Sequence, residues 1–222
     1  MLDICFFVLG IAGVGLLLYF LFELHYFFRS LLCVILSRLF KKRVHILDET
    51  CITGLCMSND IDYLMDHMNN ARYIRELDFA KIDFHQRTNL YKAAIDKGGS
   101  MFVGATTIRY RRFIKVFTRY HIRTKIIYWD NQNIYLEHQF VTKGEFVNTI
   151  ALCRIRLVNI DVEELMKELI QKLPKGVDPE AAMREKPPMP LELEKWIESN
   201  QISSERLRES NNVDNCQEAS KV

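Results

Sequence analysis

The first forty residues are almost continuously apolar, and this pattern predicts a membrane anchor. Residues 4–22 contain no charged side chain and consist mostly of Leu, Phe, Val, Ile and Gly. As a helix that rises ~1.5 Å per residue, they would extend over about 29 Å, close to the thickness of a hydrocarbon core. The alternative is a cleaved secretory signal, which would release a secreted or luminal protein. Met1-Leu2-Asp3 provides no basic start and no small-residue cleavage site follows, which favours the uncleaved anchor.

A second apolar segment, residues 26–40, follows the predicted span and ends in a basic cluster. It carries Arg29 and Arg38, and residues 41–43 read KKR, whereas only Asp3 precedes the span. This composition is typical of a helix that lies on the membrane surface and extends its basic side chains to the headgroups. By the positive-inside rule, we expect the domain to face the cytosol from an internal membrane such as the endoplasmic reticulum.

Helical periodicity next predicts one long helix from Asn70 to about Ile95. Residues 67–70 read HMNN, where an Asn can cap the helix, and residues 96–99 read DKGG, which ends it. Apolar residues between these points recur at helical spacing: Tyr73, Ile74, Leu77, Ala80, Phe84 and Leu90.

Period-two alternation then predicts four strands, at residues 101–111, 116–128, 134–142 and 146–157. In the second of them one face is apolar, formed by Val116, Tyr120, Ile122, Ile126 and Tyr128. The opposite face is polar, formed by Arg119, His121, Arg123 and Lys125. Short turns connect the later strands and make them antiparallel. Such a meander can bend around the single helix and bury it, which gives an α+β fold.

The C-terminal quarter changes character. Residues 161–173 have the spacing of an amphipathic helix, and a Pro-, Glu- and Ser-rich tail follows Pro174. We expect a short helix around Trp196 and disorder from about residue 203. The chain therefore divides into a membrane anchor with its basic helix (1–43), a folded domain (44–174) and a partly disordered tail (175–222).

Composition excludes several classes of function. The chain has 30 Lys and Arg against 28 Asp and Glu, so no overall field favours nucleic acid, and we predict no nucleic-acid partner. The six cysteines lack the spacing of a disulfide framework or a zinc site, and we interpret them as reduced thiols. We predict no metal and no cofactor.

One local motif carries a family resemblance. Asn59-Asp60-Ile61-Asp62 followed by residues 67–73, HMNNARY, resembles the D-x-D and H-(V/M)-N-N-x-x-Y signature of the hotdog thioesterases. That superfamily includes 4-hydroxybenzoyl-CoA thioesterase and the plant acyl-acyl-carrier-protein thioesterases. Together with residues 128–130, 135–137 and 140–141, the motif resembles more closely still the thioesterase superfamily member six family of animals, which also has a membrane-inserting N-terminus.

The resemblance implies a hotdog fold, in which a five-stranded antiparallel sheet wraps a central helix, and a homodimer that pairs sheets edge to edge. It also implies catalysis at the N-terminus of that helix, where backbone N–H groups and the helix dipole stabilise an oxyanion. Residue by residue, Asp62 corresponds to the acting carboxylate, His67 to the motif histidine, and Asn69 and Asn70 to the Asn pair. Asp62 and His67 are five positions apart instead of the family's usual four.

Each of these residues also has a structural interpretation. Asp62 can cap a turn, His67 can bond backbone in the first helical turn, and Asn69 and Asn70 can serve as helix caps. Tyr73 fits the core better than catalysis.

Seven cations without an intervening acid lie between residues 109 and 125, and they are candidate ligands for the phosphates of coenzyme A. The arginines among them are Arg109, Arg111, Arg112, Arg119 and Arg123. A solvated strand face, or a face held against anionic headgroups, is the alternative.

Two functions follow from these patterns. The first is an acyl-CoA thioesterase-like enzyme at the membrane, supplied with fatty acyl chains from the bilayer. The second is a non-catalytic protein at the same membrane that binds lipid or acyl-CoA, or acts as a scaffold. The position of the Asp62 carboxylate distinguishes them. A carboxylate that points into a pocket toward the start of the helix at Asn70 favours the enzyme, and one that points to solvent favours the binding protein.

Overall fold

The computed structural model describes residues 2–21, 24–63, 66–176 and 178–219. In chain order, its first elements are α1 (Leu2–Leu21), α2 (Leu24–Leu39), β1 (Thr50–Leu55), α3 (Asn70–Thr88), α4 (Leu90–Asp96) and β2 (Ser100–Tyr110). The remainder are β3 (Arg119–Trp129), β4 (Asn133–Thr142), β5 (Phe146–Val158), α5 (Val162–Gln171), a 3-10 helix η1 (Pro179–Met183) and α6 (Leu191–Ala219). Two compact units divide at residue 184, and the second contains only α6 and the residues around it.

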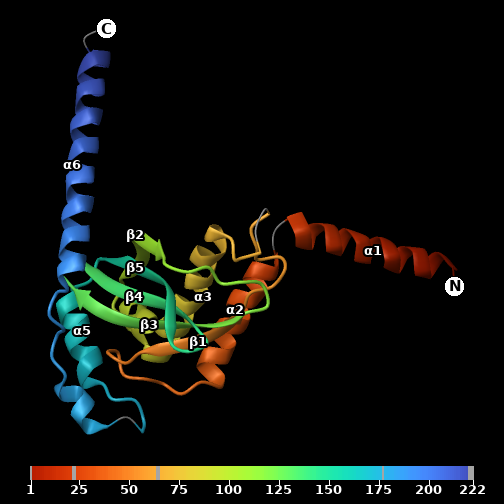
Figure 1. The fold of residues 1–222 in the computed structure, drawn as a ribbon, viewed down its shortest axis with the longest axis horizontal. Helices are drawn as coiled ribbons and strands as arrows, with labels where there is room; N and C mark the ends of the chain where they lie inside the picture. Colours follow the sequence, from red (N-terminus) through yellow and green to blue (C-terminus); the bar gives the residue numbers. More distant parts are fainter. Residues whose placement is uncertain (1, 22–23, 64–65, 177, 220–222) are drawn as a thin grey trace. The chain divides into compact units, whose positions relative to one another are not determined.

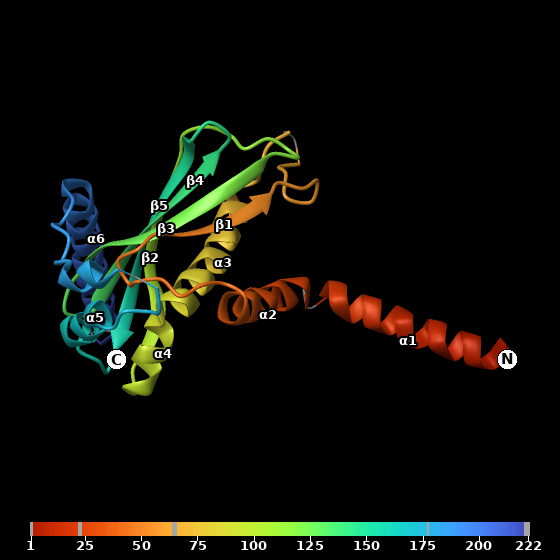
Figure 2. The same ribbon diagram turned by 90° about the horizontal axis from the view of Figure 1, so that it is seen from below.

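Five antiparallel strands form one sheet in the order β1-β3-β4-β5-β2, and this sheet curves around α3 (Figure 1, Figure 2). Tyr73, Leu77 and Phe84 of α3 are almost fully buried, and Ile122 and Phe140 of the sheet belong to the same core. The predicted α+β hotdog fold is therefore confirmed. Short hairpin loops and alternating apolar residues dictate this arrangement, because both require antiparallel neighbours with one buried face.

The single long helix predicted up to Ile95 is wrong. The helix divides at Asn89, whose φ of 64° lies in the left-handed region and makes it both the C-cap of α3 and the N-cap of α4. Asn tolerates this conformation better than most residues, so it can end one helix and begin another without a glycine.

The predicted apolar face of the third strand is correct only in its middle. Tyr120, Ile122 and Ile126 are buried, but Val116 precedes β3. A register shift between Ile126 and Tyr128 changes the alternation, so that Ile127 and Trp129 are buried and Tyr128 is not. A bulge of this kind leaves no clear mark in the sequence.

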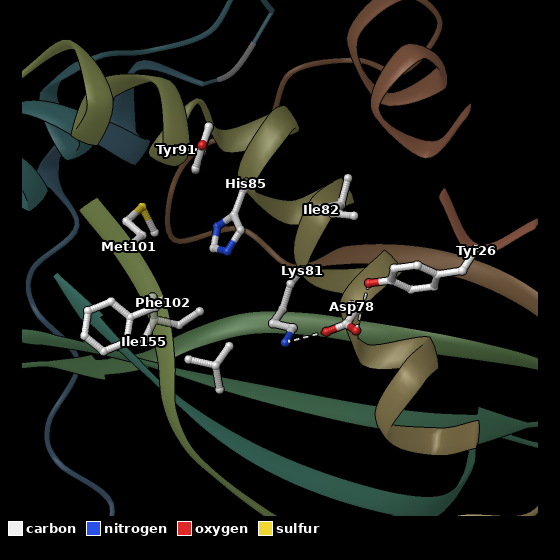
Figure 3. A pocket seen from close by; sticks show the side chains of 10 residues that line it. Tyr26, Asp78, Lys81, Ile82, His85, Tyr91, Met101, Phe102 and Ile155 are labelled. Atoms are coloured by element: carbon white, nitrogen blue, oxygen red, sulfur yellow. Dashed lines mark hydrogen bonds and ion pairs between the residues drawn. The ribbon is translucent and has the colours of Figure 1, made fainter. Parts of the chain in front are cut away.

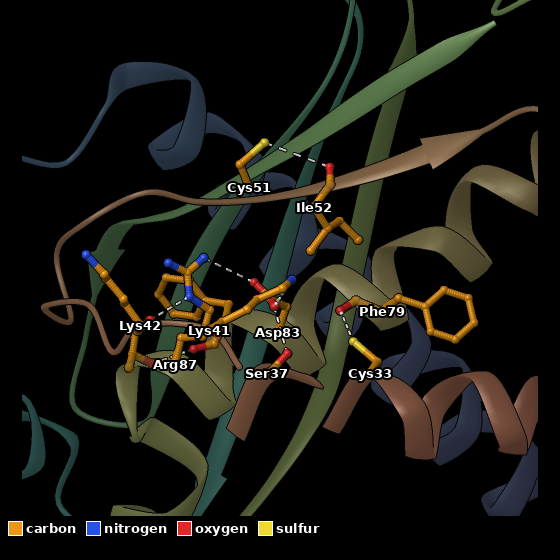
Figure 4. Close-up of polar contacts among 11 residues, drawn as sticks. Cys33, Ser37, Lys41, Lys42, Cys51, Ile52, Phe79, Asp83 and Arg87 are labelled. Atoms are coloured by element: carbon orange, nitrogen blue, oxygen red, sulfur yellow. Dashed lines mark hydrogen bonds and ion pairs between the residues drawn. The ribbon is translucent and has the colours of Figure 1, made fainter. Parts of the chain in front are cut away.

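Helix α2 packs on α3 through polar contacts (Figure 4). Arg29 forms a bidentate pair with Glu76 at 2.5 and 2.6 Å, and Ser37 and Lys41 bond Asp83 at 2.7 and 2.6 Å. The expectation that Arg29 and Lys41 extend to lipid headgroups is therefore corrected. Both side chains compensate carboxylates of α3 that are buried.

The opposite side of α2 is apolar and exposed. Its large exposed side chains are Phe27, Phe28, Leu31, Leu32, Ile35, Leu36 and Leu39. Within the described ranges, no single helix is long and apolar enough to cross a membrane. The pair Phe6–Tyr19 and Leu24–Leu39 meets that requirement jointly, with a bend of 78° between them. Residues 22 and 23, at the predicted end of the span, lie outside the described residues.

The predicted amphipathic helix at residues 161–173 is confirmed as α5. Asp161 caps it by accepting from Glu164 N, and Val162, Leu165, Met166 and Leu169 are buried. The helix expected around Trp196 is longer than predicted, since α6 runs from Leu191 to Ala219, and the disorder expected from about residue 203 stays a prediction. No Gly or Pro interrupts residues 191–219, and the segment is rich in Glu, which favours helices. The four cysteines with described side chains are free thiols, as expected.

Candidate functional site

The motif forms a tight antiparallel turn directly before α3. Asp62 N donates to His67 O at 2.8 Å, Asn69 N donates to Asp60 O at 2.8 Å, and Ile61 pairs with Met68. These bonds fix both arms of the turn. The five-position spacing from Asp62 to His67 is therefore compatible with a closed turn, and residues 64 and 65 between them lie outside the described residues.

Asn69 connects the carboxylate of Asp62 to the start of α3. Its Oδ1 accepts from Ala71 N at 2.9 Å and caps the helix, while its Nδ2 donates to Asp62 Oδ2 at 3.2 Å. Asp62 is partly exposed. One amide side chain thus holds a carboxylate beside the positive end of a 19-residue helix. The structural interpretation of Asn69 as a cap is correct, and the same side chain also orients Asp62.

Asp60, the other acid of the motif, has a structural position. It is only 7% exposed, pairs with Arg72 in the first turn of α3, and accepts from Met57 N at 2.9 Å. These contacts give the Asp60 side chain a role in holding the local fold. Of the two motif aspartates, Asp62 is therefore the one near solvent.

His67 lies outside the helix, which corrects its predicted place in the first helical turn. Its ring is 8% exposed and packs on Phe113 with 3.9 Å between ring centroids, and its backbone pairs with Lys115. The backbone carbonyl of His67 accepts the hydrogen bond from Asp62 N described above. The ring thus holds the segment between β2 and β3 against the turn.

Asn70 is the first residue of α3 and is exposed. Its carbonyl accepts from the Tyr110 hydroxyl at 3.2 Å. Tyr73 is in the core, as predicted, and its hydroxyl accepts from Ile114 N at 3.3 Å. The site therefore unites Asp62, Asn69 and Asn70 at the helix start.

The five predicted phosphate ligands separate into groups. Arg111 and Arg112 lie next to the site, since their segment continues to Phe113, and both guanidinium groups face the ring of Phe146, at 5.3 and 4.0 Å from its centroid. Arg109 is exposed on β2. Arg119 and Arg123 are on β3, and Arg123 pairs with Glu145 and Glu49. Arg111 and Arg112 thus fit a ligand at the helix start better than Arg123 does.

Two contributors to the site were missed from the sequence. Phe113 covers His67, and Asn148 bridges Arg112 O and Phe113 O through its Nδ2 at 3.4 Å while accepting from Thr142. Neither belongs to the motif, and only the return of β5 beside the end of β2 brings Asn148 there. No local pattern could have identified them.

A thiol nucleophile does not fit this site. Cys56 is fully buried next to the motif, and burial, with a smaller effect of Asp60, raises the pKa of its thiol to about 11. The thiol therefore stays protonated at neutral pH, and a thiolate is the reactive form of cysteine. The described carboxylate that is bonded to the cap of α3 is that of Asp62.

Three cavities are lined by described residues. The first, of about 290 Å³, lies between α3, α4 and β2 (Figure 3). The second, of about 340 Å³, lies near Arg87 and Leu169, and the third, of about 210 Å³, lies between α2, α3 and β1. Asp62 and His67 line none of these three.

Comparison with known proteins identifies the family. The family model of the thioesterase-like superfamily matches residues 56–197. Protein THEM6 of Drosophila melanogaster is 41% identical over 194 residues, covering 87% of this chain and 95% of that protein, and Protein THEM6 of Danio rerio is 35% identical over 202 residues, covering 90% and 94%. The solved structure of YbaW, a probable thioesterase from Escherichia coli, is 18% identical, with a TM-score of 0.49 over 55% of this chain and 96% of that one. The chain belongs to the thioesterase-like superfamily.

Proposed function

We propose that this protein is a membrane-tethered acyl-CoA thioesterase that hydrolyses fatty acyl thioesters at the N-terminus of α3. The observation that carries the proposal is the Asp62 carboxylate, held by the same Asn69 that caps the helix. Asp62 either attacks the thioester carbonyl or takes a proton from the attacking water. The start of α3 then stabilises the negative charge that develops on the carbonyl oxygen.

The full-length protein tests this proposal directly. A panel of acyl-CoA chain lengths is incubated with it, and release of the coenzyme A thiol is measured beside binding of the same acyl-CoA. Turnover supports the enzyme. Binding without turnover supports the second candidate, a non-catalytic acyl-CoA-binding or scaffold protein.

Coenzyme A phosphates are the ligands that we propose for Arg111 and Arg112. Replacing both with alanine should raise KM for acyl-CoA about tenfold and change kcat little, because phosphate contacts hold the substrate and its transition state alike. Arg123→Ala is the matched control, since that guanidinium pairs with Glu145. Acyl-pantetheine, which lacks the nucleotide phosphates, should show no effect. An equal effect on both substrates would contradict the assignment.

Helices α1 and α2 are the proposed attachment to an endomembrane, the endoplasmic reticulum, with the domain in the cytosol. The exposed apolar side of α2 supports this, since Phe28 and Leu31 are 62% and 56% exposed. In brominated-lipid nanodiscs, a tryptophan at Phe28 should therefore be quenched more than one at Tyr91, which is on α4. Equal quenching would contradict the in-plane position.

The cytosolic orientation of the domain has its own test. Protease added to intact microsomes should remove the domain, and protection would instead indicate a luminal domain.

A homodimer is proposed on the free edge of the sheet. β2 is an edge strand, and Phe102 and Val103 on it are 49% and 43% exposed. Pairing of two β2 strands would satisfy the unpaired backbone groups of this edge. The full-length protein in mild detergent should sediment with the protein mass of two chains, and a monodisperse monomer at high concentration would exclude this dimer.

A further inference from the structure

The cavity between α3, α4 and β2 has an apolar wall and a polar end, which is the composition of a ligand site. Ile82, Met101, Phe102, Val103 and Ile155 form much of its lining, and Lys81 and His85 extend into it from α3 (Figure 3). At ~1.5 Å per residue, these two side chains lie about 18 to 24 Å along the helix from Asn69. The cavity is therefore separate from the proposed thioester site.

The polar end contains hydrogen-bonding capacity that the described part of the chain does not use. Lys81 Nζ pairs with Asp78 at 2.9 Å, and Asp78 also accepts from the Tyr26 hydroxyl at 3.2 Å. An ammonium group has three donors, so Lys81 can bond a second acceptor. His85 lines the cavity, and its buried Nδ1 has no hydrogen-bond partner among the described residues.

A second histidine with an unpartnered ring nitrogen lies in the core, outside the lining of this cavity. His138 of β4 is fully buried; its Nδ1 lies 2.8 Å from Thr124 Oγ1, and its Nε2 has no partner among the described groups. Burial, with a smaller effect of the Lys81 charge, lowers the pKa of His85 to about 4 and that of His138 to about 3, so both rings are neutral at pH 7. Buried polar atoms without partners are rare in native proteins and call for a ligand or water.

The charges at this end favour an anionic head group. Lys81 balances the Asp78 carboxylate in the lining, and the guanidinium of Arg75 lies 5.0 Å from the ring of Tyr26, which also lines the cavity. A carboxylate can accept from Lys81 and from a His85 tautomer that carries its proton on Nδ1. The volume is small for a lipid site, so a longer chain would extend over the half-exposed Tyr91 and Phe102.

We propose that this cavity binds a fatty acid, with its carboxylate at Lys81 and His85 and its chain along Met101, Phe102 and Ile155. A fatty acid is the product of the proposed thioester hydrolysis. The inference rests on the proposed function only in that this hydrolysis would supply the fatty acid. Binding itself does not require Asp62.

A photoreactive fatty acid tests the site in the full-length protein, held in nanodiscs. The probe carries a diazirine near its tail, and its crosslinks are mapped by mass spectrometry after illumination. We expect crosslinks within residues 91–103, reduced at least fivefold by Lys81→Met and by His85→Phe. Lys92→Met, an exposed lysine on α4 that does not line this cavity, should leave them unchanged. Decanoate should compete with the probe, whereas decanol, which lacks the carboxylate, should compete much less.

Three results would overturn the inference: crosslinks that map elsewhere, equal labelling of Lys81→Met and Lys92→Met, or equal competition by decanol. Thermal unfolding of each variant checks folding, and either Lys81→Met or His85→Phe suffices if the other does not fold. Asp62→Asn should retain the labelling, so failure of the thioesterase proposal and failure of this site are separable.

Discussion

Replacing Arg29 with methionine should lower the free energy of unfolding by about 3 kcal/mol, the low end for breaking a buried ion pair. Glu76 is 3% exposed, Arg29 bonds its two carboxylate oxygens at 2.5 and 2.6 Å, and the Tyr120 hydroxyl also bonds this carboxylate. Without the guanidinium, the Glu76 carboxylate would remain buried in a site shaped for an ion pair. The low end applies because Arg29 itself is 42% exposed.

A double variant separates the lost partner from lost packing. Arg29→Met combined with Glu76→Gln should recover most of the stability, since the uncompensated charge is gone. Arg38→Met is the matched control on the exposed side of the same helix, and we expect it to change stability by less than about 0.5 kcal/mol. Denaturant unfolding in mild detergent, followed by the fluorescence of buried Trp129, measures all variants. Equal loss in Arg29→Met and Arg38→Met would contradict the role of the pair.

The same contacts bear on which part of the chain can be studied alone. Ser37, Lys41 and Arg87 all contact Asp83, whose side chain is fully buried. A chain that begins at residue 44 lacks Arg29, Ser37 and Lys41 and exposes the face of α3 that α2 covers. For this reason the experiments above use the full-length protein.

Local sequence patterns were sufficient to predict most of the helices and strands of the fold. The Asn pair marks the start of α3 because a side-chain cap is a short-range interaction, and hairpin turns mark β3, β4 and β5 for the same reason. β1, at residues 50–55, was not located, because its pairing with β3 is long-range and its sequence, TCITGL, has no marked alternation. Gly54 within it faces the ring of Tyr120 so closely that an added Cβ would lie 2.3 Å from a ring atom, a fit set entirely by the partner strand.

The orientation of α2 could not be read from its sequence. Its apolar residues predict contact with lipid or core, but only the acids of α3 determine which side turns inward. Because Glu76 and Asp83 lie on that side of α3, Arg29 and Ser37 of α2 face the domain, and large apolar side chains such as Phe28 and Leu31 face out, unlike those of an ordinary surface helix.

Some residues of the candidate site could be predicted from the sequence motif, and others could not. The motif identified Asp62, Asn69 and Asn70, which the helix start brings together over a few residues. It gave no information on Phe113 or Asn148, which reach the site through strand order, and it could not separate Arg111 and Arg112 from Arg123. Identical side chains differ here only in their neighbours, Phe146 for the first two and Glu145 for the third.

Asp62→Asn should reduce acyl-CoA hydrolysis at least ~10²-fold, the low end for removing a positioned acid or base. The substitution keeps the size of the side chain and an oxygen that can accept from Asn69 Nδ2, but it removes the negative charge and the basic lone pairs that the reaction uses. Since Asp62 is partly exposed, folding and acyl-CoA binding should change little. The loss should therefore appear in kcat with KM nearly constant.

Two controls determine whether this loss is specific to Asp62. Asp66→Asn changes an exposed aspartate of the same turn, whose 3.5 Å pair with Lys115 is solvent-accessible, and it should retain nearly full activity. His67→Ala should cost less than Asp62→Asn, because the His67 ring packs on Phe113 and acts by holding the turn in place. If Asp62→Asn retains wild-type kcat, the carboxylate is not the catalytic group. If Asp66→Asn loses as much activity as Asp62→Asn, the effect belongs to the conformation of the turn and not to chemistry at the start of α3.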